Sequence, residues 1–189
     1  MELTESYTLP ISQQRTWEAL NDTAVLRASI PGCESIEADG ENAFALSMSA
    51  SVGPVKARFK GRMLLTDIDA PQTYTIVFEG QGGVAGFGKG SARVVLESEG
   101  ADATKLTYTA SAQVGGKLAQ IGSRLVDGAA RKLAGEFFRR FIAQLSGEGD
   151  AAAETAAAAD TASNDGADAA SGDDQTKRKK SWTAWISKS

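Results

Sequence analysis

Basic and aromatic side chains gather near the C-terminal end of the chain, where they could hold it against a lipid surface. Four consecutive cations stand at positions 177–180, and two of the three tryptophans follow within five residues. Tryptophan rings favour the headgroup level of a bilayer, and each cation near an anionic leaflet contributes about 1 kcal/mol. We therefore expect this tail to bind the membrane through Lys177, Arg178, Lys179, Lys180, Trp182, Trp185 and Ile186.

A run of four cations is also typical of a solvated surface segment or of a nucleic-acid-binding peptide. Two observations favour lipid. Trp182, Trp185 and Ile186 are spaced to share one face of a helix, and polar tails rarely carry tryptophan. The rest of the chain is not basic, so we expect no nucleic-acid partner.

The side chains that most often do catalysis are scarce. The sequence has no histidine and one cysteine, Cys33. This excludes histidine-based triads, most zinc and haem ligation, and an internal disulfide framework. Cys33 follows a predicted turn and is expected to be a small buried hydrophobe rather than a nucleophile, because no histidine could activate it. We predict neither a catalytic residue nor a metal site.

A glycine-rich stretch at residues 83–90 comes close to a phosphate-binding loop. It has the glycine spacing and a lysine, but Gly90 stands where Ser or Thr should bind Mg²⁺. A strand rather than a helix is predicted to follow, so the helix N-terminus that would hold a phosphate is missing. We expect a mobile hairpin here, and no nucleotide site.

Charge divides the chain into three segments. Residues 1–146 carry 15 basic and 16 acidic side chains and can bury a core, so they form the predicted folded domain. Residues 147–176 carry eight acidic and no basic side chains among many alanines, and are expected to be a disordered tether with a reach of about 30 Å. Residues 177–189, with five basic and no acidic side chains, form the tail.

The N-terminal residues contain no apolar run, and no stretch of the sequence reaches the roughly 18 apolar residues of a membrane-spanning helix. We therefore expect a cytoplasmic protein that binds peripherally to the inner face of the cell membrane.

The hydrophobic periodicity changes in an informative order along the first segment. A strand comes first, then two short helices, six strands in quick succession and one long helix. Turn signals such as Asp39-Gly40 and Gly53-Pro54 separate the strands. The predicted strands cover 3–9, 34–38, 43–51, 55–67, 73–79, 92–99 and 104–114, and the helices cover 13–20, 23–29 and about 117–145.

These strands have one apolar and one polar face. Between 55 and 65 the odd positions are apolar or small, whereas the even ones include Lys56, Arg58, Lys60 and Arg62. Short connections imply an antiparallel sheet, and the apolar stripe of the long helix can cover it. The sequence predicts an α+β fold: a curved antiparallel sheet of about seven strands wrapped around a long C-terminal helix, with two short helices. The cationic stripe is either a solvated face or a docking surface for an acidic partner or lipid headgroups.

Small residues stand where this sheet and helix should meet. Gly122, Gly128 and Gly135 fall within the predicted helix, and Gly61 and several alanines fall on the inward sheet face. They either allow close helix–sheet contact or leave an apolar cavity, and we favour the cavity. Its predicted lining is Phe44, Met48, Phe59, Met63, Tyr74, Phe78, Tyr108, Leu125 and Phe137.

Residues 1–146 resemble the family of the carbon monoxide dehydrogenase G subunit, within the helix-grip (START/Bet v 1-like) superfamily. The resemblance rests on five segments in the same order: TWEALND at 16–22, IPGCE at 30–34, VGPVKA at 52–57, FKG at 59–61 and VGGKLAQIGSR at 114–124. It implies a non-enzymatic accessory protein that brings a molybdenum-containing carbon monoxide dehydrogenase, or a similar respiratory oxidoreductase, to the membrane and its quinone pool.

The leading hypothesis is that the cavity binds menaquinone or another isoprenoid quinone as a non-covalent ligand. A polyprenyl chain must be enclosed to leave lipid, and each buried CH₂ is worth about 0.8 kcal/mol. Two alternatives remain: a membrane-recruitment subunit with a packed interior, and a cyclase-like enzyme. An enzyme would need polar side chains on the inward faces, where the pattern places only Tyr74 and Tyr108.

Overall fold

The computed structural model describes residues 1–157, and side chains are described as far as residue 147. The tail at 177–189 and most of the predicted tether therefore lie outside the described residues. In chain order the elements are β1 (Glu2–Leu9), α1 (Gln13–Leu20), α2 (Thr23–Ser29), β2 (Cys33–Ala38), β3 (Ala43–Val52), β4 (Val55–Asp69), β5 (Thr73–Gln81), the 3₁₀ helix η1 (Gly83–Ala85), β6 (Phe87–Ser98), β7 (Thr104–Gly115), α3 (Lys117–Gln120) and α4 (Ser123–Ala157).

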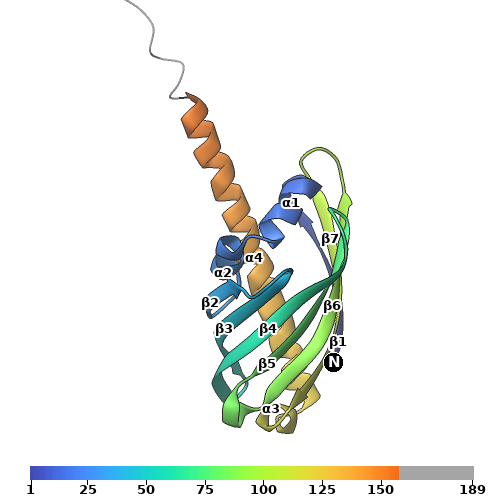
Figure 1. The fold of residues 1–189 in the computed structure, drawn as a ribbon, viewed down its shortest axis with the longest axis vertical. Coiled ribbons are helices and arrows are strands. Elements are labelled where there is room, and N and C mark those ends of the chain that lie inside the picture. The colour runs from blue at the N-terminus through green and yellow to red at the C-terminus, as the bar shows by residue number, and fades with distance from the viewer. Residues whose placement is uncertain (158–189) are drawn as a thin grey trace, which may run out of the picture.

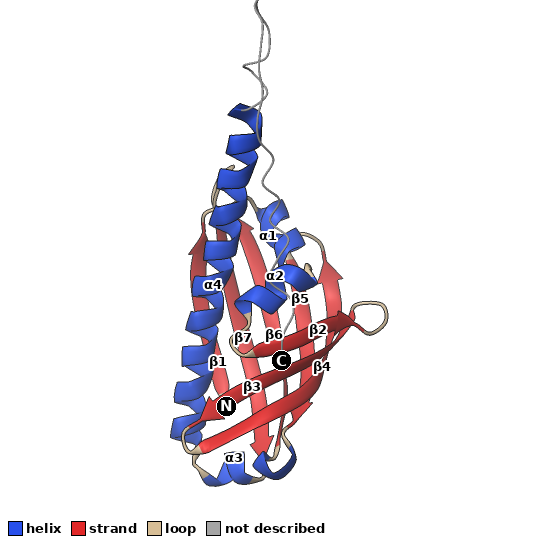
Figure 2. Ribbon diagram, turned by 90° about the vertical axis from the view of Figure 1, so that its left-hand side faces the viewer, coloured by secondary structure: helices blue, strands red, loops and turns tan. Residues whose placement is uncertain are grey.

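All seven strands belong to one sheet in the order β1-β7-β6-β5-β4-β3-β2, and every neighbouring pair is antiparallel. Strands β2 to β7 follow one another across the sheet in chain order, and β1 lies at the edge of the sheet beside β7. The sheet curves around α4, which runs along its inner face, and α1 and α2 lie together near one end of the sheet (Figures 1 and 2). The α+β helix-grip architecture predicted from the sequence is confirmed.

Both short helices begin at side-chain caps. The Ser12 hydroxyl accepts a hydrogen bond from the backbone of Arg15 at the start of α1. Asp22 accepts from the N–H groups of Ala24 and Val25 at the start of α2, at 2.7 and 3.3 Å. Such caps satisfy donors that have no partner within the helix. They hold α1 and α2 over the end of the sheet, where much of the core lies.

The hydrophobic core includes residues of α1 and α2 as well as of the sheet and α4. Leu9, Leu96, Leu106 and Phe141 are fully buried there, and they come from β1, β6, β7 and α4. The buried hydroxyl of Thr104 donates to the carbonyl of Ile11 at 2.8 Å, so the chain entering α1 is held to the start of β7. The elements that surround the interior are thus fixed to one another at this end.

Three predicted boundaries are wrong. The long helix does not start at 117, because Gly122 takes a φ of +92° and separates α3 from α4. Gly122 is therefore not inside a helix. At the other end, α4 continues to Ala157 rather than stopping near 145, so the start of the segment predicted to be a disordered tether is helical. Alanine has the highest helix propensity, which accounts for the extension.

Strand β6 begins at Phe87, five residues before its predicted start at 92, within the stretch expected to be a mobile hairpin. Gly90 pairs with Phe78 of β5 and Ala112 of β7, and a Cβ on Gly90 would overlap the Ser111 carbonyl oxygen. Glycine therefore belongs to the strand because its neighbours approach closely, although a glycine-rich composition by itself suggests a loop.

Candidate functional site

An apolar cavity of about 240 Å³ lies between the sheet, α4 and the two short helices. Strands β3 to β7 form its base, α4 crosses it, and α1 and α2 close one end. Among the residues whose side chains the structure describes, its lining contains no charged group and two hydroxyl groups, those of Tyr74 and Tyr108. The full lining is Leu20, Leu26, Ile30, Phe44, Met63, Leu65, Tyr74, Ile76, Ala92, Val94, Leu106, Tyr108, Ala134, Phe137 and Phe138.

Five of the nine residues predicted to line the cavity do so: Phe44, Met63, Tyr74, Tyr108 and Phe137. The other four, Met48, Phe59, Phe78 and Leu125, do not. Met48 of β3 and Phe59 of β4 are cross-strand partners, and Phe59 lies against Gly82. Phe78 lies beside Gly90. Alternation assigns each residue to a face of the sheet, but not to a position along it.

Leu125 was misplaced for a different reason. Its side chain is 50% exposed on the first turns of α4, so it lies outside the cavity. It borders a separate pocket of about 750 Å³, here called the lateral pocket, between α4 and the β3–β4 turn. Its lining mixes apolar and charged residues: Pro31, Ser51, Gly53, Arg124, Leu125, Gly128, Ala129, Lys132, Leu133 and Glu136.

The cavity and the lateral pocket are neighbours. Ile30 lines the cavity, whereas the next residue, Pro31, lines the lateral pocket. On α4, Ala134 lines the cavity and the preceding residue, Leu133, lines the lateral pocket. Nothing lies within 4 Å of the position that a Cβ on Gly128 would occupy. The glycine is therefore not there to allow close helix–sheet contact, and it leaves space beside α4.

A polar cluster that the sequence analysis missed stands on the inward face of β1. The Glu5 carboxylate accepts hydrogen bonds from the hydroxyls of Tyr7, at 2.7 Å, and Tyr108, at 3.0 Å. Arg131 of α4 lies 4.0 Å from the same carboxylate. The signal was available, since the odd positions of β1 include the apolar Leu3 and Leu9 as well as Glu5 and Tyr7. The inward faces thus carry more polar groups than the two tyrosines predicted.

Aromatic rings connect this cluster to the cavity wall. The ring of Phe138 stacks on Tyr7 with centroids 4.1 Å apart, and Tyr108 is stacked 5.8 Å away. Burial, followed by the hydrogen bond to Glu5, raises the pKa of Tyr7 to about 12. The same two causes, in the same order, raise the pKa of Tyr108. Both rings are packed, and both hydroxyls are taken up by Glu5.

Tyr74 differs from these two tyrosines. It lies on β5, is 3% exposed and lines the cavity, with the edge of Trp17 against its ring at a centroid distance of 5.3 Å. Burial raises the pKa of its hydroxyl, which therefore stays protonated at neutral pH. No hydrogen bond joins this hydroxyl to any other residue in the part of the chain that the structure describes.

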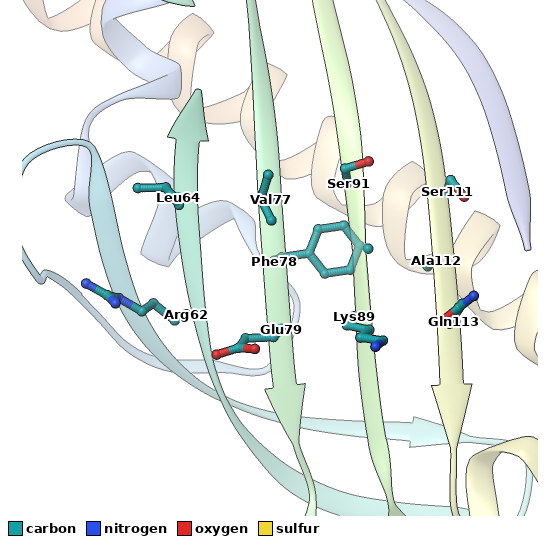
Figure 3. A pocket seen from close by; sticks show the side chains of 11 residues that line it. Arg62, Leu64, Val77, Phe78, Glu79, Lys89, Ser91, Ser111, Ala112 and Gln113 are labelled. Carbon is teal, nitrogen blue, oxygen red and sulfur yellow. The ribbon is translucent and has the colours of Figure 1, made fainter. Parts of the chain in front are cut away.

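Another pocket, of about 560 Å³, extends across β4 to β7 (Figure 3). Its lining is mixed, with charged groups from Arg62, Glu79 and Lys89 beside Leu64 and Val77. It contains the predicted cationic stripe only in part. Such a surface lacks the apolar enclosure of the cavity, and it is the weaker candidate for a lipid-like molecule.

The cationic stripe of β4 is exposed, and two of its four members are paired. Arg58 contacts Glu34 at 2.8 Å and Arg62 contacts Asp39 at 3.0 Å, each across to β2 or the turn that follows it. Pairs of this kind on a surface contribute little to stability. The pairing fits a solvated sheet face better than a docking surface.

Cys33 is half-buried, and burial raises the pKa of its thiol, which disfavours the reactive thiolate. Within residues 1–157, no cluster of three or more Cys, Asp or Glu side chains is placed to hold a metal ion. None of the helices in this part of the chain is long and apolar enough to cross a membrane.

Residues 6–146 match the sequence profile of the family of the carbon monoxide dehydrogenase G subunit (CoxG). The chain belongs to this family. The family predicted from the five sequence segments is thereby confirmed. The comparison with curated protein sequences gives no match.

Solved structures agree with the family assignment. A conserved protein from Geobacillus kaustophilus is 32% identical, with a TM-score of 0.73, over 77% of this chain and 95% of its own. The Zhui aromatase/cyclase from Streptomyces sp. R1128 is 12% identical, with a TM-score of 0.58, over 76% of this chain and 92% of its own. A START superfamily protein from Mycobacterium smegmatis is 16% identical, with a TM-score of 0.53, over 78% of this chain and 95% of its own. The last two share the fold alone.

Proposed function

We propose that this chain is a non-catalytic accessory protein that binds an isoprenoid quinone, with menaquinone as the leading candidate, in the apolar cavity. It would carry the quinone between the membrane and a carbon monoxide dehydrogenase or a similar molybdenum-containing oxidoreductase. The observation that supports this most is the cavity itself, which is apolar and enclosed by sheet and helix. The family and fold fit a ligand-binding accessory protein.

The size of the cavity limits what it can hold. Pockets for drug-sized ligands usually span about 300–1,000 Å³, and this one has about 240 Å³. A quinone ring fits such a space, but a long isoprenoid chain does not. The lateral pocket lies next to the cavity in sequence at Ile30-Pro31 and Leu133-Ala134, and its apolar residues would hold the chain, although Arg124, Lys132 and Glu136 also line it. Each CH₂ buried there would contribute about 0.8 kcal/mol.

The proposed partner and the proposed membrane binding rest on different observations. The family description names a carbon monoxide dehydrogenase, which supports an oxidoreductase of that kind as the partner. Membrane binding rests on the cationic, tryptophan-containing tail at 177–189, which lies outside the described residues. A peripheral position on the inner face of the cell membrane would bring the cavity within reach of the quinone pool.

We propose no catalytic step. The cavity lining offers two hydroxyls as its polar groups, and Glu5 already binds that of Tyr108. The likeness to an aromatase/cyclase, at 12% identity, concerns the fold. A pure anchor with a packed interior is disfavoured by the cavity.

The ligand can be tested on the full-length protein. Purified protein is incubated with quinone-loaded vesicles and re-isolated, and its organic extract is analysed by mass spectrometry. The proposal expects about one quinone per chain. Ala134→Phe, which fills the cavity from α4, should abolish this uptake. Ala143→Phe makes the same change at an exposed position of the same helix and should leave uptake intact. Wild-type protein that takes up no quinone would contradict the proposal.

A further inference from the structure

The hydroxyl groups of the three tyrosines in this chain differ in their hydrogen bonding. The hydroxyls of Tyr7 and Tyr108 both donate to Glu5, whereas that of Tyr74 has no hydrogen-bond partner among the described residues. Yet Tyr74 is the most buried of the three, at 3% exposure, and it lines the cavity.

The Tyr74 hydroxyl keeps some accessible surface, since among the described residues Oδ1 of Asp127 is the side-chain polar atom that is both fully buried and without a partner. It is therefore free to donate a hydrogen bond to an acceptor that reaches it. Phenylalanine would fill nearly the same volume and keep the T-shaped contact with Trp17, but it would offer no hydrogen-bond donor. An acceptor brought into the cavity by a ligand would pair with the Tyr74 hydroxyl.

We propose that the Tyr74 hydroxyl donates a hydrogen bond to a carbonyl oxygen of the ligand, so that the quinone ring enters the cavity first and lies beneath α1 and α2. This inference rests on the proposed function and specifies how the site works. The isoprenoid chain then trails toward the lateral pocket, past the Leu133-Ala134 step of α4.

The surroundings of Tyr74 also define the class of ligand. As far as the structure describes it, the cavity lining has no Lys, Arg, Asp or Glu, so a charged headgroup would be buried there without a counter-ion. A neutral ligand whose carbonyl oxygen accepts a hydrogen bond from the neutral Tyr74 hydroxyl does not bury an unpaired charge. Burial keeps the hydroxyl protonated, and it is therefore a donor throughout the physiological pH range. The site selects a neutral, carbonyl-bearing ring over a fatty acid or a phospholipid.

A pair of probes that differ only in their oxygens tests this assignment. 2,3-Dimethyl-1,4-naphthoquinone and 2,3-dimethylnaphthalene have nearly the same shape, and the methyl groups protect the quinone from attack by Cys33. Their binding to the full-length protein is measured by equilibrium dialysis. We expect the wild-type protein to prefer the quinone by about 3- to 10-fold, the contribution of one hydrogen bond. Tyr74→Phe should remove most of this preference.

Tyr7→Phe is the matched control, because it deletes a hydroxyl bonded to Glu5 on a ring that does not line the cavity. It should leave the preference for the quinone unchanged. Infrared spectroscopy adds a second readout. The C=O stretching band of the quinone bound to wild-type protein should lie at lower frequency than in hexane, and Tyr74→Phe should reverse this shift.

The outcomes separate the inference from the function on which it rests. Equal quinone preference in wild-type protein and Tyr74→Phe overturns the inference while quinone binding stands. The same holds if the wild-type protein binds both probes equally or shows no infrared shift. Binding of neither probe overturns the inference and the proposed function together. Without added probe, Tyr74→Phe should melt close to the wild-type temperature, which shows that a loss of preference is not a loss of folding.

Discussion

Glu5 is an acidic side chain on an otherwise apolar inward face, and two tyrosines make its position tolerable. Its carboxylate receives both hydroxyls within 3.0 Å, and Arg131 is close enough to offset its charge. Charge-assisted hydrogen bonds are stronger than neutral ones. The cluster therefore fixes the β1–β7 end of the cavity wall to the aromatic stack of α4.

This cluster predicts an alkaline transition. The ordinary tyrosine pKa is 10.0, and in the folded chain that of Tyr7 is about 12, with those of Tyr74 and Tyr108 also raised. Because the folded pKa values exceed the unfolded ones, the associated stability is complete below pH 10 and declines as the pH rises toward 12. Titration monitored at 295 nm should show no tyrosine ionised in the folded protein at pH 10.5.

The control for this titration is the protein unfolded in urea, whose tyrosines should ionise near pH 10. Tyr7→Phe should remove the earliest step of the folded-state titration. A folded protein in which one tyrosine ionises near pH 10 would contradict the geometry of the Glu5 cluster.

Among the helices and strands, glycines in α4 and β6 have opposite roles. Gly135 lies inside α4 with open space where its Cβ would be, whereas a Cβ on Gly90 in β6 would overlap the Ser111 carbonyl oxygen. Gly135→Ala should raise the free energy of unfolding by about 1 kcal/mol, through helix propensity and a less flexible unfolded chain.

Gly90→Ala makes the same chemical change in the sheet and should lower the free energy of unfolding by about 2 kcal/mol, because β6 must move away from β7. Urea unfolding followed by circular dichroism measures both variants. The same sign of change in the two proteins would show that the close approach of β6 and β7 does not constrain position 90.

The cap of α2 is relevant to the cavity because Leu26, in the middle of this helix, and Ile30, directly after its last residue, line the cavity. Asp22→Ala removes the acceptor for two backbone N–H groups and should lower the free energy of unfolding by about 1 kcal/mol. Asp22→Asn keeps a capping oxygen, so its free energy of unfolding should fall by much less. Urea titration compares them, and equal losses would mean that the carboxylate charge matters rather than the cap.

Across the molecule as a whole, the folded domain and the tail should be separable. Deleting residues 177–189 should abolish co-sedimentation with vesicles that contain anionic lipid, because about five cations and two tryptophans are lost. The proposal expects an unchanged melting temperature, because it assigns the tail to lipid and not to the folded domain. Replacing Trp182 and Trp185 with serine separates the aromatic from the electrostatic contribution.

Raising the salt concentration is the matching test of charge, since screening should weaken binding of the wild-type protein to vesicles. A truncated protein that still binds anionic vesicles as the wild-type protein does would contradict the membrane role of the tail. It would not bear on the cavity, which is tested by quinone uptake.

The order and type of nearly all elements follow from local sequence patterns. Alternation of apolar and polar residues, together with turn signals such as Asp39-Gly40 and Gly53-Pro54, predicted seven strands and both short helices. Local pattern failed where glycine has two meanings: Gly90 was interpreted as part of a loop and lies in a strand, and Gly122 was interpreted as helical and separates two helices.

Which inward residues share the cavity depends on how the sheet is folded in space. Its curvature brings Phe44, Met63 and Tyr74 together and leaves Phe59 further along the same face, a difference that alternation does not encode. The pairing of Glu5 with Tyr108 joins positions 103 residues apart, so it depends on the β1–β7 register. Likewise, only the tertiary structure shows that the Tyr74 hydroxyl has no hydrogen-bond partner within the described residues, because residues far apart in the sequence surround it.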